Sequence, residues 1–243
     1  MSCMICGRVP TIKSHLIPKT FAREVQVGKA HAYARNSDDF DHTQSGIYER
    51  NILCKDCDNE LGKWENIAAK AFRQIREESK DDPLGEHKLK DVSGDEILRF
   101  IAGLLWKYSV ASKDNGRIDL GPYQDLMKGL AFSLQQVPNS IDALVCRLRR
   151  HEGDDDVFAY RAPKPDRQEG VNGYRVLVGG MFIFVKTDKQ TPRGGALERS
   201  AMRGKSDLPY VLLRAQDFEE YRLSAKLAHE GRLSDFLNKQ DGQ

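Results

Sequence analysis

The segments Cys3-Met4-Ile5-Cys6 and Cys54-Lys55-Asp56-Cys57 carry the strongest structural signal in this chain of 243 residues. Each segment is a Cys-x-x-Cys pair, and two thiolates two residues apart at a tight turn both reach one tetrahedral metal ion. The spacing therefore predicts a structural zinc ion held by Cys3, Cys6, Cys54 and Cys57. The alternative reading is four free thiols.

Three helices are predicted between the second cysteine pair and Pro138. One begins near the second pair and ends at Glu78, because apolar residues recur at helical spacing: Leu61, Trp64, Ile67, Ala68, Phe72 and Ile75. The capping-box pattern of Ser93 and Glu96 predicts a second helix that stops near Asn115. A third helix is expected over 121–136, before Pro138.

Strand-forming segments dominate the rest of the chain. Strands are expected at 143–149 and 157–161, and 174–186 predicts two short strands or one bent strand. Cys146 lies mid-strand and is expected to be a buried small side chain. The last part of the chain is expected to hold, in order, a Gly-rich basic loop at 190–209, a strand at 210–213 and a helix at about 216–229.

This order of elements indicates an α+β fold. The expected architecture is an N-terminal four-cysteine zinc module, a helical segment, a mixed or antiparallel β region and a C-terminal helix. We expect two domains, with the zinc module and its long helix at 1–84 and an α+β domain at 85–243.

Composition excludes some classes of protein and leaves others open. Hydrophobic residues make up 40% of the chain and charged residues 30%, which is typical of a globular domain with a polar surface. No segment resembles a membrane span or a signal peptide, so we expect a cytoplasmic protein without membrane partners. Residues 1–60 hold eight Lys/Arg and eight Asp/Glu, so any nucleic-acid contact must come from local patches.

Residues 1–65 resemble the HNH endonuclease superfamily in its treble-clef, ββα-metal form. The resemblance rests on the two cysteine pairs, on Ser14-His15-Leu16-Ile17-Pro18, and on the polar residues after Cys57. A treble clef tolerates the 47-residue gap between the pairs, because insertions fit between its hairpin and its helix. The resemblance implies that His15 is the general base. It also implies that Asp58 and His15 are ligands of a catalytic Mg²⁺ or Mn²⁺, with Asn59 and Glu60 as possible substitutes for Asp58.

Two positions depart from the superfamily pattern. Ser14 stands where the family often has an aspartate that binds the metal. Glu49 stands where the middle asparagine is usual, and the nearest asparagine is Asn51. Glu49 is therefore a candidate to orient His15 or to bind the metal, while a catalytically silent finger fits the same two departures.

Basic residues of the second half are candidates for nucleic-acid contact, since each phosphate contact adds salt-dependent affinity. Those residues are Arg147, Arg149, Arg193, Arg199 and Arg203. A solvated strand edge protected by charge is the alternative for each segment.

Three hypotheses follow. The first is a zinc-stabilised endonuclease that hydrolyses DNA, with residues after 85 serving target recognition or assembly; the resemblance implies a phage, mobile-element or antiphage-defence setting. The second is a non-catalytic zinc finger that binds nucleic acid or protein. The third is an interaction protein whose finger only organises the larger domain. The sequence identifies no protein partner and leaves homo-oligomerisation open.

Overall fold

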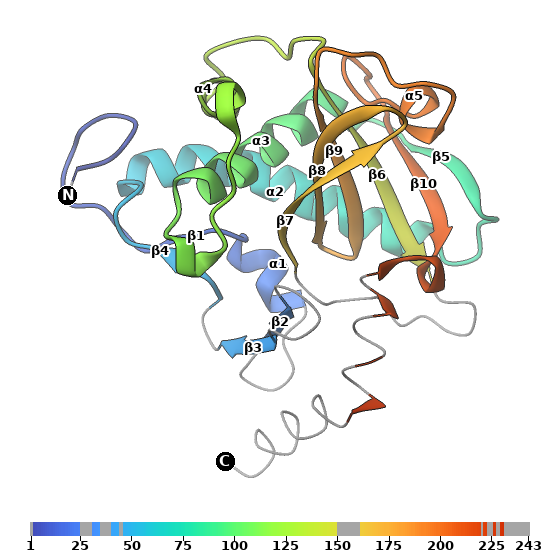
Figure 1. The fold of residues 1–243 in the computed structure, drawn as a ribbon, viewed down its shortest axis with the longest axis horizontal. Helices are drawn as coiled ribbons and strands as arrows, with labels where there is room; N and C mark the ends of the chain where they lie inside the picture. The colour runs from blue at the N-terminus through green and yellow to red at the C-terminus, as the bar shows by residue number, and fades with distance from the viewer. Residues whose placement is uncertain are drawn as a thin grey trace.

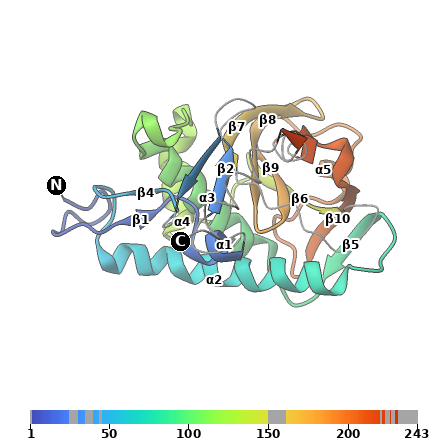
Figure 2. The ribbon, with the colours of Figure 1, turned by 90° about the horizontal axis from the view of Figure 1, so that it is seen from below.

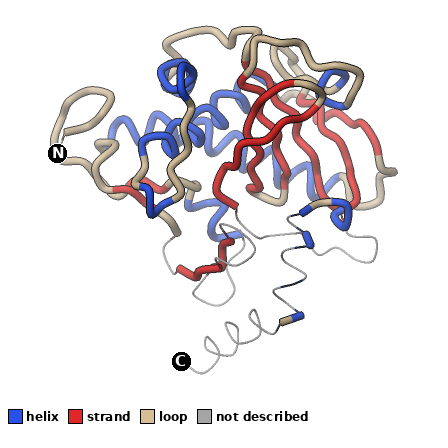
Figure 3. The backbone as a smooth tube through the Cα atoms, in the orientation of Figure 1, coloured by secondary structure: helices blue, strands red, loops and turns tan. Residues whose placement is uncertain are grey.

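The computed structural model describes residues 2–24, 31–34, 40–43, 46–149 and 161–219, together with a few residues between 221 and 230. Within these ranges the chain has mixed α+β architecture, with its two longest helices on one side of a six-stranded sheet (Figures 1 and 3). The predicted α+β class is confirmed at this level.

The N-terminal end is built from very short strands. Strands β1 (Ser14–His15) and β4 (Tyr48–Glu49) form an antiparallel ribbon in which Ser14 pairs with Glu49 and His15 with Tyr48. Between them the chain adds helix α1 (Lys19–Glu24) and the hairpin of β2 (His31–Ala34) and β3 (Phe40–Thr43). This inserted segment explains the long gap between the cysteine pairs.

Helix α2 (Lys55–Glu78) connects this end to the sheet. It begins directly after Cys54, as predicted, and its 24 residues extend about 36 Å. Figure 2 shows α2 running along one side of the molecule, from beneath the β1–β4 ribbon to the region of β5 and β10. At its far end the Arg76 side chain donates a hydrogen bond to the Gly179 carbonyl in the turn of a sheet hairpin.

Helix α3 (Gly94–Val110) is the most buried helix and packs against both α2 and α4 (Gln124–Ala131). Ser93 is its N-cap residue, as predicted, although the Ser93 side chain makes no capping hydrogen bond. The helix ends at Val110 rather than near Asn115, and the 3₁₀ turns η1 (Lys113–Asn115) and η2 (Gly121–Tyr123) follow. The third helix, predicted over 121–136, is also shorter, because α4 ends at Ala131.

The sheet has the strand order β5-β10-β6-β9-β8-β7. Only the β10–β6 pair is parallel, and the other neighbours are antiparallel. Its strands, in chain order, are β5 (Gly85–Leu89), β6 (Ile141–Arg149), β7 (Arg161–Gln168), β8 (Val171–Val178), β9 (Met181–Thr187) and β10 (Leu208–Arg214). The segment 174–186 therefore forms two strands rather than one bent strand.

Both faces of the sheet are covered. The larger core lies between one face and helices α2 and α3, and it is continuous from Cys3 and Leu16 to Leu212. The smaller core, on the other face, includes Phe182 and Phe184 and packs against helix α5 (Ala196–Arg199) and the turn η3 (Ala215–Asp217). The larger core thus crosses the expected boundary at residue 84.

Most of the strand expected at 157–161 and much of the helix expected at 216–229 lie outside the described residues. Among the described helices, none combines the length and the apolar character that crossing a bilayer requires.

Candidate functional site

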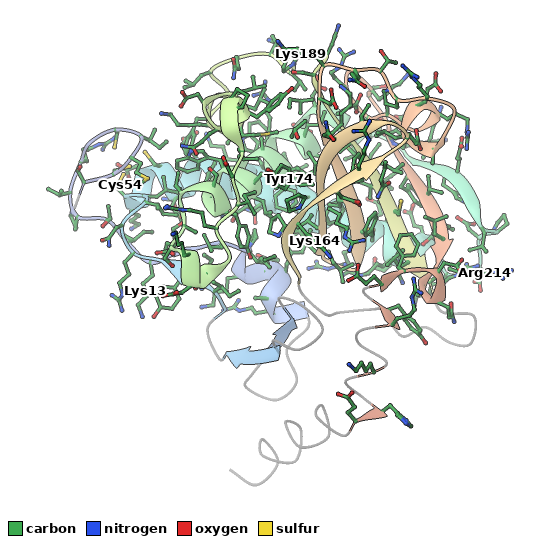
Figure 4. The ribbon with its side chains drawn as sticks, viewed as in Figure 1. Lys13, Cys54, Lys164, Tyr174, Lys189 and Arg214 are labelled. Atoms are coloured by element: carbon green, nitrogen blue, oxygen red, sulfur yellow. The ribbon has the colours of Figure 1, made fainter. Side chains whose placement is uncertain are left out.

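The four predicted zinc ligands lie together at the end of the molecule away from the sheet, where Figure 4 labels Cys54. Their Sγ atoms all lie within 4.8 Å of one another, and the Sγ of Cys6 is 3.6 Å from those of Cys54 and Cys57. Zn–S bonds of about 2.3 Å in a tetrahedron place sulfurs about 3.8 Å apart. The cluster therefore has the donor type and the spacing to hold a metal ion such as zinc.

Local backbone structure brings the two pairs together. The first pair lies on a tight turn in which the Gly7 amide donates to the Cys3 carbonyl, and Gly7 has the positive φ of 72° that favours glycine. The Met4 amide then donates to the Ile52 carbonyl, which ties this turn to the segment before Cys54. Cys54 is the N-cap residue of α2 and Cys57 lies in the first turn of α2.

The thiols of the cluster differ in how readily they ionise. Burial opposes ionisation of Cys3, but hydrogen bonds from the backbone of Cys6, Cys54 and Ile5 outweigh it and lower the pKa of Cys3 to about 6. Burial and the neighbouring sulfurs raise the pKa of Cys57. Four sulfurs this close cannot all ionise without a cation among them, so the arrangement favours a bound metal ion.

His15 lies on β1 with its ring beside its register partner. The His15 and Tyr48 ring centroids are 6.2 Å apart in an edge-on arrangement. The His15 carbonyl accepts a hydrogen bond of 2.6 Å from Nζ of Lys107, which also pairs with Glu65 at 2.8 Å. Lys107 is only 2% exposed, so a buried charge from α3 fixes the strand that carries His15.

Asp58, Asn59 and Glu49 take different positions around the ribbon. The Ser14 hydroxyl donates a 2.6 Å hydrogen bond to Asp58 Oδ1, while Asn59 is exposed. Glu49 Oε1 accepts hydrogen bonds from the Ser112 amide at 2.6 Å and from Asn115 Nδ2 at 2.8 Å. Burial opposes ionisation of Glu49, but these bonds outweigh it and lower the pKa of its carboxyl.

The two faces of the ribbon therefore carry different groups. Neighbouring residues of a strand point to opposite faces. Ser14, held by Asp58, lies on one face together with its partner Glu49, and His15 and Tyr48 lie on the other. Among the described residues, the four cysteines are the only group of three or more potential ligands close enough to hold a metal ion.

Arg147 and Arg149 are engaged in the fold. Arg147 is 5% exposed and donates to the Leu148 carbonyl, so little of its side chain is available to a ligand. Arg149 Nη1 donates to the carbonyls of Ser79, Lys80 and Asp82, directly beyond the C-terminal end of α2. Arg149 therefore holds the turn that follows α2.

The remaining predicted contacts lie around the loop before β10. Arg193 and Arg203 are exposed, and the Arg199 side chain pairs with Glu86 at 2.6 Å. Asp142 holds this loop, because its Oδ1 accepts hydrogen bonds from the backbone amides of Met202 and Arg203.

Sequence reasoning missed two features of the site. A single lysine inside the apolar run of α3 is a signal for a paired buried charge, and Lys107 fits it. Basic and aromatic residues at alternate positions on both sides of the insertion, Lys13 and His15 before it and Tyr48 and Arg50 after it, indicate one shared face of a ribbon. Comparison with protein-family models, curated proteins and solved structures finds no match to this chain.

Proposed function

We propose that this protein is a zinc-stabilised, HNH-like endonuclease that hydrolyses phosphodiester bonds in DNA, with His15 as general base. The observation that supports the proposal most is the order of elements at the cysteine cluster. An antiparallel ribbon presents His15, and the helix that follows begins between two cysteines of the cluster. This order supports the ββα arrangement that the resemblance of residues 1–65 implies.

In the proposed reaction, the His15 imidazole accepts a proton from water. The resulting hydroxide attacks phosphorus, and the bond from phosphorus to the leaving oxygen breaks, which requires a proton for that oxygen. Lys107 holds the His15 backbone, and Tyr48 packs against the ring, so the imidazole is positioned from two sides.

The two proposed metal ions differ in their fit to the chain. Four clustered thiolates suit zinc in a structural role, with Cys3, Cys6, Cys54 and Cys57 as its ligands. A catalytic Mg²⁺ or Mn²⁺ prefers oxygen ligands, and the described residues gather no such set beside His15. Asp58 is held by Ser14 on the other face of the ribbon from the His15 ring.

A non-catalytic zinc module that binds nucleic acid is the second candidate. The hydrogen bond between Ser14 and Asp58 favours it, because the carboxylate implied as a metal ligand already has a structural role.

Plasmid cleavage by the purified protein, with and without added Mg²⁺ or Mn²⁺, distinguishes the two candidates. The nuclease proposal expects nicked or linear product from the wild type, none from His15→Ala, and retained activity in the control His87→Ala on β5. Zinc content and circular dichroism must match across the three proteins. Cleavage that survives His15→Ala contradicts the role of His15, and absence of cleavage from all three proteins favours the binding module.

A further inference from the structure

Two cations and His15 surround one aromatic ring on the outer side of the β1–β4 ribbon. Nζ of Lys13 lies 4.8 Å from the Tyr48 ring centroid, and the Arg50 guanidinium carbon lies 5.7 Å from it. The His15 ring approaches the same tyrosine edge-on. We call Lys13, His15, Tyr48 and Arg50 the Tyr48 cluster.

The geometry of the ribbon explains why these four side chains meet. His15 and Tyr48 are register partners, so their side chains share a face. Lys13 precedes Ser14 and Arg50 follows Glu49, and alternation returns both to the His15 face. Lys13 and Arg50 are exposed, and Tyr48 is half-buried.

Nearby acidic groups are directed elsewhere. Glu49 is held by Ser112 and Asn115, Asp58 by Ser14, and Glu65 by Lys107. Within the described part of the chain, neither Lys13 nor Arg50 forms an ion pair. The positive charge of the cluster is therefore not neutralised by the carboxylates that flank the ribbon.

We propose that the Tyr48 cluster is the contact point for the phosphate backbone of a DNA duplex. Cations over a tyrosine face are attracted by the ring and lose little of their hydrogen-bonding capacity, so Tyr48 holds Lys13 and Arg50 in place for phosphate oxygens. This proposal rests on DNA being the ligand, as in the proposed function, and it holds for the nuclease and for the binding module alike. In the nuclease it places the bound backbone beside His15.

The test measures binding separately from cleavage. Fluorescence anisotropy with a labelled DNA duplex, in buffer without added divalent ions, compares the wild type with the double variant Lys13→Ala/Arg50→Ala. The matched control is Lys189→Ala/Arg214→Ala, which removes one exposed Lys and one exposed Arg far from Lys13 (Figure 4). Titrations between about 50 and 200 mM salt give the number of phosphate contacts.

Loss of both cations is expected to weaken binding about tenfold at low salt and to reduce the salt slope by about two, with the control unchanged. Tyr48→Leu is expected to lose part of the affinity, while Tyr48→Phe retains it because the ring and not the hydroxyl holds the cations. Equal losses in the double variant and the control indicate net charge alone and overturn the proposal. Unchanged binding in the double variant, or no binding by the wild type, also overturns it.

Cleavage assays on the same proteins separate this proposal from the nuclease. Selective loss of binding in the double variant, with no plasmid cleavage by the wild type, supports the cluster and contradicts the nuclease. Wild-type cleavage combined with unchanged binding in the double variant supports the nuclease and overturns the cluster.

Discussion

At the N-terminal end of the molecule, β1 and β4 share two residue pairs, whereas β6 and β9 in the sheet share seven. The sheet is held by a long backbone ladder with an apolar core on each face. In place of that ladder, the N-terminal end has four clustered sulfurs, the buried Lys107 paired with the half-buried Glu65, and side-chain hydrogen bonds. Where strands are this short, contacts between side chains must hold the backbone in place.

Metal removal should have the largest effect and should be confined to one region. Structural zinc contributes on the order of 10 kcal/mol to the folding of small zinc domains. In Cys54→Ser we expect loss of bound zinc and of amide protection around Cys3–Cys6 and the first turn of α2, while β6 and β9 stay protected. Hydrogen exchange by mass spectrometry, with zinc quantified in the same samples, checks this.

The control for metal loss is Cys146→Ala. Cys146 is buried in β6 and is not one of the four clustered cysteines, so its replacement leaves the proposed metal ligands in place. The variant should keep its zinc. Loss of protection throughout the sheet in Cys54→Ser would show that the two regions do not differ as described.

Phe72→Ala should weaken both regions together. Phe72 is fully buried, and its ring lies 5.7 Å from that of Phe21 at the N-terminal end and 6.0 Å from that of Phe100 in α3. Truncation of a buried phenylalanine costs about 3–5 kcal/mol. We expect that loss in the free energy of unfolding, measured by urea denaturation, with zinc still bound to the folded protein.

Leu134→Ala is the control for Phe72→Ala, because Leu134 is 73% exposed and its truncation should change stability by less than about 0.5 kcal/mol. If Phe72→Ala costs no more than this control, the core does not join the two regions.

Arg149→Met should destabilise the sheet end of α2 alone. The variant removes the cation that binds the carbonyls of Ser79, Lys80 and Asp82, and hydrogen bonds to charged groups contribute about 1.5–3 kcal/mol. Urea denaturation should show a loss in this range. Arg193→Met changes an exposed arginine and serves as the control. Equal effects of the two variants would show that Arg149 does not stabilise the turn after α2.

The sequence predicts helical and metal-binding features better than it predicts the sheet. Apolar residues at helical spacing locate α2, and the Cys-x-x-Cys spacing identifies the four clustered sulfurs. The edge strands β5 and β7 are harder to find. β7 contains Pro163 and Pro165, which a strand tolerates at the edge of a sheet but which weaken its signal in the sequence.

Basic residues show the clearest limit of sequence reasoning. Arg147 and Arg149 form a basic strand end in the sequence, yet one is buried and the other binds carbonyls of the turn after α2. Lys13 and Arg50 are separated by the whole insertion and meet only because β1 pairs with β4. Which charges remain available to a ligand depends on tertiary contacts that local patterns do not encode.

Glu49→Gln should give the smallest effect, and one that depends on pH. Hydrogen bonds from Ser112 and Asn115 lower the pKa of Glu49 in the folded chain. Ionised Glu49 therefore stabilises the fold at pH values above its unfolded pKa of about 4.3, and this contribution is lost as pH falls through the folded pKa. With partial solvent screening we expect about 0.5–1 kcal/mol near neutral pH.

The measurement for Glu49 is the difference in unfolding free energy between wild type and Glu49→Gln, followed from neutral pH downward. Acid also protonates the cysteine thiolates and releases metal, but it does so in both proteins, so the difference isolates Glu49. The difference should shrink below pH of about 4.3. A difference that is constant with pH would mean that the charge of Glu49 does not stabilise the junction between β4 and the end of α3. The β1–β4 ribbon would then be stabilised by the cysteine cluster and Lys107.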